Sequence, residues 1–151
     1  MPKIIHKQFV NAPIETCFDL ARNVEVHTKT TSQTNEIAVG GVTEGFLEKG
    51  DTVTWEATHF CIRQRLTAKI TSMDRPNQFI DIMIQGAFHS FHHTHDFQEV
   101  SEGTIMIDTF EYKAPFGILG KLADKLFLER YMKKFIISRS VELKKIAEKS
   151  S

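Results

Sequence analysis

Apolar and polar residues alternate along most of the first 112 positions, which is the period of β-strands with one buried face. The segments in which this alternation predicts a strand are, in chain order, 3–10, 36–39, 51–58, 62–72, 78–85, 88–100 and 104–112. The later connections are short, and Ser101–Gly103 has the composition of a tight turn. We therefore expect consecutive strands to pair in one antiparallel sheet of seven strands.

Two short helices are predicted between the first and second strands. Asn11 and Pro13 supply a cap and an early proline, and apolar residues then recur with helical spacing from Ile14 to Ala21. A second helical segment is expected from Asn23 to about Lys29. Between that segment and residue 113 the pattern predicts no helix.

Beyond Pro115 and Gly117 the apolar period changes to 3.6 residues, which predicts one long amphipathic helix. Its apolar stripe consists of Leu119, Leu122, Ala123, Leu126, Phe127, Tyr131, Phe135, Ile136, Leu143 and Ile146. A helix of roughly 30 residues is about 45 Å long and needs a large apolar partner. The predicted fold class is therefore α+β, with a curved sheet wrapped around this helix in a single domain over residues 1–148 and a frayed tail at 149–151.

Composition excludes several functional classes. The 151 residues carry 19 basic and 19 acidic side chains, so the chain has no bulk charge for holding nucleic acid. It has no apolar run of about 18 residues and no secretory signal, and its two cysteines are too few for a disulfide framework. We expect a cytoplasmic monomer or homodimer that does not insert stably into membranes.

The balanced charge hides two opposed segments. Residues 1–112 have a net charge of −6, and residues 113–151 have a net charge of +6. This division indicates a basic helix that complements an acidic sheet, and the alternative is a patch that contacts RNA or a membrane.

The side chains expected to face the helix follow from the alternation. On the last two strands they are His89, Phe91, His93, His95 and Phe97, and Thr104, Met106, Asp108, Phe110 and Tyr112. On the earlier strands they are Val53, Trp55 and Ala57, then Ile62, Gln64, Leu66, Ala68 and Ile70, then Phe79, Asp81 and Met83. The last assignment turns Ile80, Ile82 and Ile84 outward, and such an apolar patch indicates either a dimer contact or the opposite register.

Two further features carry candidate chemistry. Four glycines, Gly40, Gly41, Gly45 and Gly50, predict a mobile lid, because their pattern lacks the Lys-Ser/Thr of a nucleotide loop. Arg63 and Arg65 alternate outward, which is typical of surface charge, with an anion site as the alternative.

The sequence also resembles a known superfamily. The run Phe91–Phe97 (FHHTHDF), the strand Gly103–Tyr112, and the segments Ala114–Gly120 and Leu126–Met132 are similar to bacterial cyclase/dehydrase-like members of the START-like (SRPBCC) superfamily, which includes the birch pollen allergen family. The resemblance covers essentially the whole chain. It departs from the family at Cys61, where Gly is expected, and at Ala87, where Pro is expected.

The resemblance implies a helix-grip fold with a cavity between the sheet and the helix that holds an apolar or aromatic small molecule. We expect the chain to bind or transport a lipid, a polyketide-like aromatic or an isoprenoid, without a cofactor. The predicted ligand-binding residues are Trp55, Asp81, Met83, Phe91, His93, His95, Phe97, Met106, Asp108, Phe110 and Tyr112.

The histidines leave several interpretations open. His93 and His95 could orient a ligand's carbonyl or hydroxyl group, could be purely structural, or could ligate one metal ion with Asp108 or Asp81 as the third ligand. Alternatively, a cyclase or dehydratase would use one of the two histidines as the base, Asp108 to orient it, and Tyr112 to stabilise an enolate. No cofactor motif supports that reaction.

Overall fold

A computed structural model describes residues 2–117, 122–123 and 127–150. The strands are β1 (Lys3–Val10), β2 (Ile37–Gly41), β3 (Thr52–His59), β4 (Ile62–Asp74), β5 (Gln78–Gln85), β6 (Ser90–Val100) and β7 (Gly103–Lys113). The helices are α1 (Ile14–Ala21), α2 (Val24–Thr30), the 3₁₀ helix η1 (Ser32–Thr34) and α4 (Glu129–Lys149). The strand and helix order confirms the predicted helix-grip fold, although η1 lies where no helix was predicted.

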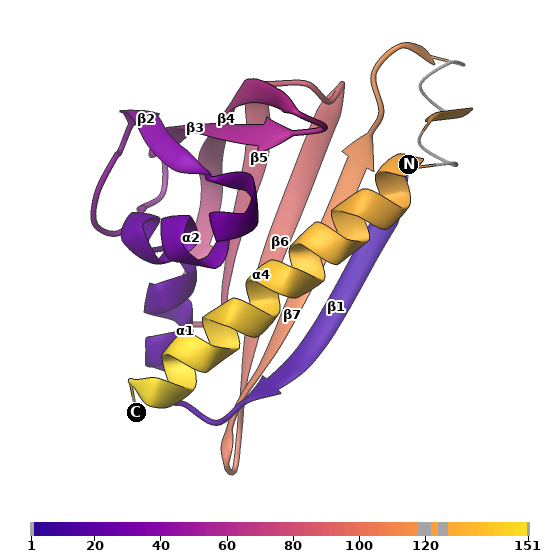
Figure 1. Cartoon of the computed structure of the whole chain (residues 1–151). Helices are drawn as coiled ribbons and strands as arrows, with labels where there is room; N and C mark the ends of the chain where they lie inside the picture. The colour runs from indigo at the N-terminus through magenta and orange to yellow at the C-terminus, as the bar shows by residue number, and fades with distance from the viewer. Residues whose placement is uncertain (1, 118–121, 124–126, 151) are drawn as a thin grey trace.

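The seven strands form one antiparallel sheet in the order β1-β7-β6-β5-β4-β3-β2. Helix α4 crosses one face of this sheet, and helices α1 and α2 lie beside the C-terminal half of α4 (Figure 1). The buried residues of α4 recur every three or four positions, which is the spacing of one helix face. They are Met132, Ile136, Ser140, Leu143 and Ala147.

The described residues before α4 are helical, as predicted, but they are not part of the buried stripe. Helix α4 starts at Glu129, ten residues after Leu119, and its 21 residues correspond to about 31 Å. Leu119 and Leu126 lie outside the described residues. Leu122 and Phe127 were predicted for the buried stripe, but they are exposed, at 57% and 66%. The described residues Leu122, Ala123, Phe127 and Leu128 are nevertheless helical, the last two as a π-helical turn. Apolar spacing therefore predicted the helical conformation of this segment but not its exposure.

The alternation places the inward faces of the strands correctly. On β7 every second residue from Thr104 to Tyr112 is buried, and on β6 His93, His95 and Phe97 are buried. On β5 Phe79 is buried and Asp81 is paired with His93, so the isoleucines of β5 point away from α4.

Two residues depart from the predicted faces. His89 precedes β6 and is exposed, and Ile62 is 61% exposed at the first position of β4. Both lie at strand ends, where the chain has left the part of the sheet that α4 covers. Alternation therefore predicts the inward face within a strand, but it does not show where along the strand α4 stops covering the sheet.

The glycine-rich segment is attached to the first two helices. The backbone N–H of Val24 donates to Gly45 O at 2.9 Å, and the N–H of Leu47 donates to Arg22 O at 2.9 Å. The carboxylate of Glu25 accepts from the N–H of Gly45 at 2.7 Å. The segment predicted to be a lid thus lies hydrogen-bonded against the α1–α2 corner.

Candidate ligand-binding site

A cavity of about 640 Å³ lies between the sheet and α4. Its apolar wall on the sheet side consists of Val53, Trp55, Ala57, Leu66, Ala68, Ile70, Phe79, Phe88, Phe91 and Phe110. The α4 side contributes Met132, Phe135 and Ile136. A curved sheet and a straight helix cannot fill the space between them completely, so the inward-facing side chains of β3 to β7 surround this volume.

Three aromatic side chains mark the mouth of the cavity. Phe60, Phe116 and Phe127 line the cavity and are also 57%, 83% and 66% exposed. Close to them, His59 Nδ1 lies 2.6 Å from the hydroxyl oxygen of Tyr131. The cavity therefore opens to solvent beside the β3–β4 turn and the residues that precede α4.

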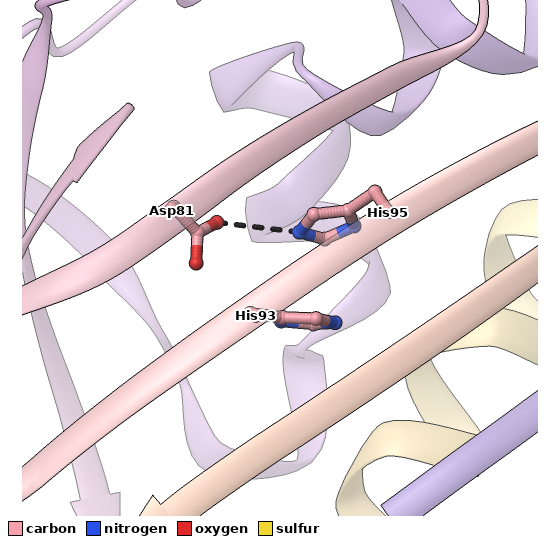
Figure 2. Close-up of side chains that lie close together, drawn as sticks. All are labelled: Asp81, His93 and His95. Carbon is pink, nitrogen blue, oxygen red and sulfur yellow. Dashed lines mark hydrogen bonds and ion pairs between the residues drawn. The ribbon is translucent and has the colours of Figure 1, made fainter. Parts of the chain in front are cut away.

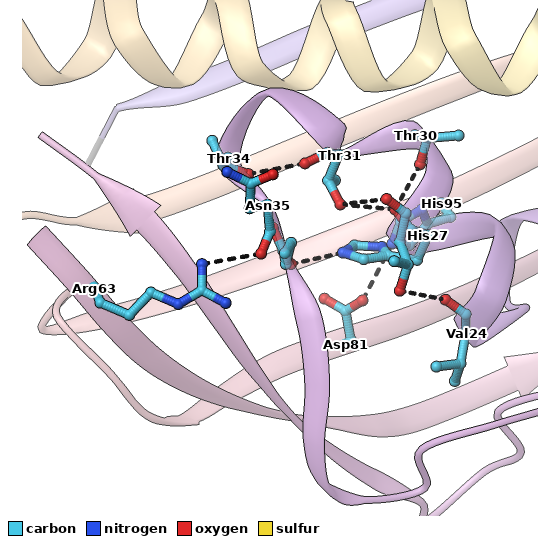
Figure 3. Close-up of polar contacts among 11 residues, drawn as sticks. Val24, His27, Thr30, Thr31, Thr34, Asn35, Arg63, Asp81 and His95 are labelled. Atoms are coloured by element: carbon cyan, nitrogen blue, oxygen red, sulfur yellow. Dashed lines mark hydrogen bonds and ion pairs between the residues drawn. The ribbon is translucent and has the colours of Figure 1, made fainter. Parts of the chain in front are cut away.

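A group of polar side chains faces the cavity between its apolar walls. His27, labelled in Figure 3 among the polar side chains of this region, has its Nε2 atom 2.7 Å from Glu36 Oε1. Its imidazole is also stacked on Trp55, with ring centroids 4.0 Å apart. Burial lowers the pKa of His27 despite the neighbouring Glu36 carboxylate. Burial raises the pKa of Glu36, but the charge and hydrogen bond of His27 outweigh it, and the net shift is downward. A neutral imidazole and an ionised carboxylate therefore form this part of the wall.

Arg139 brings a positive charge to the same region from α4. Its side chain lines the cavity, and its Nε atom is buried without a hydrogen-bond partner among the described residues. It lies in the field of Glu36 and Asp81, whose carboxyl pKa values it helps to lower. Arg139 thus places a guanidinium group, which can only donate hydrogen bonds, in the lining of the cavity.

A buried network connects the cavity wall to the core behind it. Asp108 Oδ1 lies 3.0 Å from His93 Nε2 and 3.3 Å from His95 Nδ1, and its Oδ2 accepts from Ser140 Oγ at 2.8 Å. His95 Nε2 lies 3.3 Å from Asp81 Oδ2 (Figure 2). One imidazole therefore lies between two carboxylates.

The pKa shifts in this network follow from the same contacts. Burial opposes the ionised form of Asp108, but the hydrogen bonds from His93 and His95 hold its pKa well below the ordinary value. Burial also disfavours protonated His95, yet the hydrogen bonds to Asp108 and Asp81 raise its pKa. Burial and the neighbouring charge of His95 lower the pKa of His93. The contacts therefore favour a proton on His95 more than on His93.

The predicted binding residues divide into two groups. Those that line the cavity are Trp55, Asp81, Phe91, His93 and Phe110. Those that do not line it are Met83, His95, Phe97, Met106, Asp108 and Tyr112. Phe97 and Met106 pack in the core cluster with Phe18 of α1, and Tyr112 packs with Ile4 near the start of α4. These side chains face inward as predicted, but α1 and α4 lie directly on them and leave no space.

Several cavity residues were missed by the sequence analysis. They include His27, Glu36, His59, Tyr131 and Arg139. Arg139 carried a detectable signal, because it lies three residues after Ile136 and four before Leu143, on the buried face of the helix. A charged residue at such a position indicates a polar site under the helix. His27 and Glu36 gave no comparable signal.

Comparisons with known proteins agree with this geometry at the level of the fold. No protein-family model and no curated protein matches the sequence. Among solved structures, protein TTHA0849 of Thermus thermophilus is similar, with a TM-score of 0.81, 21% identity and 99% of each chain covered. Protein CV1439 of Chromobacterium violaceum has a TM-score of 0.76 at 12% identity and covers 98% of this chain and 99% of its own. Major latex-like protein 151 of Panax ginseng has a TM-score of 0.69 at 12% identity, with 97% of each chain covered.

The structural neighbours are Bet v1-like proteins of the SRPBCC superfamily, and this chain has their helix-grip fold. At these identities the likeness shows the fold alone. Among the described residues, no helix combines the length and apolar character needed to cross a membrane.

Proposed function

We propose that this protein binds a hydrophobic small molecule in the cavity under α4 and sequesters or delivers it. The observation that carries the proposal is a cavity of about 640 Å³ with aromatic and aliphatic walls and a few grouped polar side chains. Small-molecule sites typically have volumes of roughly 300–1,000 Å³ and this kind of lining. A lipid, a polyketide-like aromatic or an isoprenoid has the required size and apolar character.

The free energy for binding would come from burial of apolar surface. A ligand that buries about 300 Å² of apolar area gains roughly 7 kcal/mol at ~25 cal/mol per Å². Part of this gain is lost to immobilisation of the ligand, so the apolar contacts alone would give a Kd weaker than roughly 10 μM, and tighter binding requires more buried area or polar contacts. The aromatic mouth at Phe60, Phe116 and Phe127 would provide an apolar entry path.

The polar group in the cavity favours a ligand with at least one oxygen atom. Among the residues that line the cavity, Arg139 has a guanidinium group that donates hydrogen bonds, while Glu36 and Asp81 have carboxylates that accept them. A hydroxyl or carbonyl group placed among them would replace water without leaving a buried polar atom unpaired. The partner in this proposal is thus an apolar molecule with a polar end. The proposal requires no nucleic acid and retains the expected cytoplasmic location.

The test combines native mass spectrometry of protein purified from its own host with titration by an apolar fluorescent probe. We expect a co-purified apolar molecule, or saturable probe binding at one site. Ala68→Phe fills the cavity from the inner face of β4 and should weaken probe binding at least tenfold. Thr71→Phe adds the same side chain on the exposed outer face of β4 and should bind normally. Equal probe binding by both variants would place the probe outside the cavity and refute the proposal.

One observation favours the cyclase or dehydratase alternative. His93 lines the cavity, and Asp108 orients its imidazole from behind at 3.0 Å. His95 does not reach the cavity, so an acid–base reaction there would depend on His93. For a substrate turned over by the protein, His93→Gln should remove turnover while ligand binding persists, and unchanged turnover would exclude this mechanism.

A further inference from the structure

We propose that Asp81, His93 and His95 bind one divalent transition-metal ion, with Zn(II) or Co(II) as the type, at the wall of the cavity. One donor atom from each of these side chains lies within 4.8 Å of the other two, and the three come from the neighbouring strands β5 and β6 (Figure 2). Two imidazoles and one carboxylate are a donor set that such ions bind. This inference goes beyond the proposed function and does not require an apolar ligand.

Strand geometry holds the three side chains on one face. His93 and His95 are two residues apart on β6, so they point to the same side, and Asp81 is the cross-strand partner of His93. The two imidazoles are stacked with centroids 3.8 Å apart, and Phe79 is stacked on the other side of His95 at 4.2 Å. The two ring planes lie only 27° apart, and an imidazole nitrogen binds a metal in the plane of its ring, so one of the two rings must turn before both can bind the same ion.

Asp108 determines which ring nitrogens remain available. An ionised carboxylate can only accept hydrogen bonds, so His93 Nε2 and His95 Nδ1, which face Asp108, both carry hydrogens. This leaves His93 Nδ1 and His95 Nε2 as the ligand atoms. A carboxylate that accepts from the outer nitrogen of a metal-binding histidine is a common feature of metal sites, and here one carboxylate holds both rings. Ser140 fixes Asp108 in turn at 2.8 Å.

Charge and space also fit a divalent ion. The two carboxylates of Asp81 and Asp108 would neutralise its two charges in this buried region. Donor atoms around a tetrahedral ion lie about 3.4 Å apart when the metal–ligand distance is about 2.1 Å. The donor atoms here lie within 4.8 Å of one another, so the site must contract by up to about 1.4 Å. Asp81 can provide this movement, because its carboxylate is hydrogen-bonded only to His95 within the described residues.

The ion would be accessible from the cavity. Asp81 and His93 line the cavity, whereas His95 lies behind them. Three protein ligands leave at least one coordination position open, as in catalytic metal sites. That position would face the space in which a bound molecule lies, and an oxygen atom of that molecule could occupy it.

The experiment is a titration of chelator-treated protein with Co(II) alone, followed by competition with Zn(II). We expect one ion per chain, visible absorption bands of low-coordinate Co(II), and loss of these bands when Zn(II) is added. Asp81→Asn and His95→Gln should weaken Co(II) binding at least tenfold, and Asp108→Asn should weaken it by about 10–100-fold. The matched control is His92→Gln, because His92 is exposed on the opposite face of β6 and its replacement should leave the affinity unchanged.

Absence of bands and of thermal stabilisation at millimolar Co(II) would overturn the proposal. Equal affinity in Asp81→Asn and His92→Gln would also overturn it, because the ion would then bind elsewhere. Circular dichroism establishes whether each variant is folded. If Asp81→Asn does not fold, X-ray absorption of the unmodified Co(II)-loaded protein decides, since the site requires two imidazole ligands. Apolar-probe binding by metal-free protein is measured separately, so a failed metal titration leaves the proposed function standing.

Discussion

The imidazole of His27 lies nearly flat against the indole of Trp55, with ring centroids 4.0 Å apart and 25° between the planes. This contact joins α2 to the inner face of β3. It also places His27 Nε2 within 2.7 Å of Glu36 Oε1, so a histidine, a carboxylate and the only tryptophan of the chain form one side of the cavity. Two measurable properties follow, one from the buried pair and one from the indole.

The His27–Glu36 pair should make the protein less stable in acid. Burial lowers the pKa of His27, and the pKa of Glu36 is also lowered, because its contacts with His27 and Arg139 outweigh burial. Both groups therefore bind protons more readily in the unfolded chain, so the contribution of His27 falls below about pH 6.5 and that of Glu36 below about pH 4.5. Urea unfolding at pH 7.5, 6, 5 and 4 measures this loss. His27→Gln should show a shallower decline over the upper part of the range, and an identical profile would remove His27 from the explanation.

Trp55 should report occupancy of the cavity. It is the single tryptophan, it is 6% exposed, and it lines the cavity, so its emission depends on what lies beside it. An apolar ligand should change the emission intensity or wavelength with one saturable curve. Ala68→Phe should shift that curve to at least tenfold higher concentration, whereas Thr71→Phe should not. A ligand that binds by calorimetry without changing the emission would have to lie away from β3.

The fold was predictable because alternation along a strand and the helical period record burial directly. On β7 the five inward positions were identified from the sequence, since Thr104 to Tyr112 alternate without interruption. The burial of the segment before α4 was not predictable in this way, because Leu122 and Phe127 are helical and continue the apolar spacing but are exposed. An apolar residue at a cavity mouth has the same pattern as one in a core.

The cavity was predictable only in part, because inward direction does not distinguish a packed side chain from one facing a void. Phe91 lines the cavity, while Phe97, six residues later on the same face, is covered by α1. The difference depends on where α1 crosses the sheet, which is a tertiary property. His27 and Glu36 reach the cavity from segments whose sequence has no pattern specific to a binding site.

Asp108 should be the most sensitive residue of the buried network. It accepts hydrogen bonds from two imidazoles and from Ser140, so Asp108→Asn would place an amide where only acceptors fit. Breaking a buried charged contact from one side typically costs about 3–5 kcal/mol, and loss of the Ser140 hydroxyl should cost about 1–3 kcal/mol. Denaturant unfolding of Asp108→Asn, and of Ser140→Ala for the hydroxyl, measures these two costs. Glu111→Gln is the control, because its ion pair with Lys3 is exposed on the other face of β7 and is worth less than about 1 kcal/mol.

The turn between β3 and β4 contains strain that a single substitution should relieve. Phe60 and Cys61 have φ angles of 52° and 64°, in the left-handed region that favours glycine. Neither is glycine, and the left-handed conformation costs roughly 1–2 kcal/mol per ordinary residue. The family that the sequence resembles led us to expect glycine at position 61, and the φ angle gives the physical reason.

Cys61→Gly should therefore increase the free energy of unfolding by about 1 kcal/mol, after allowance for the greater freedom of glycine in the unfolded chain. Denaturant unfolding under reducing conditions measures the change, because the Cys61 thiol is exposed and can oxidise. Cys61→Ala separates the two effects of the substitution, since it removes the thiol but keeps the Cβ atom that causes the strain. We expect no gain from alanine. An equal gain from both variants would assign the effect to the thiol, and a loss of stability with glycine would show that Cys61 makes compensating contacts at the mouth of the cavity.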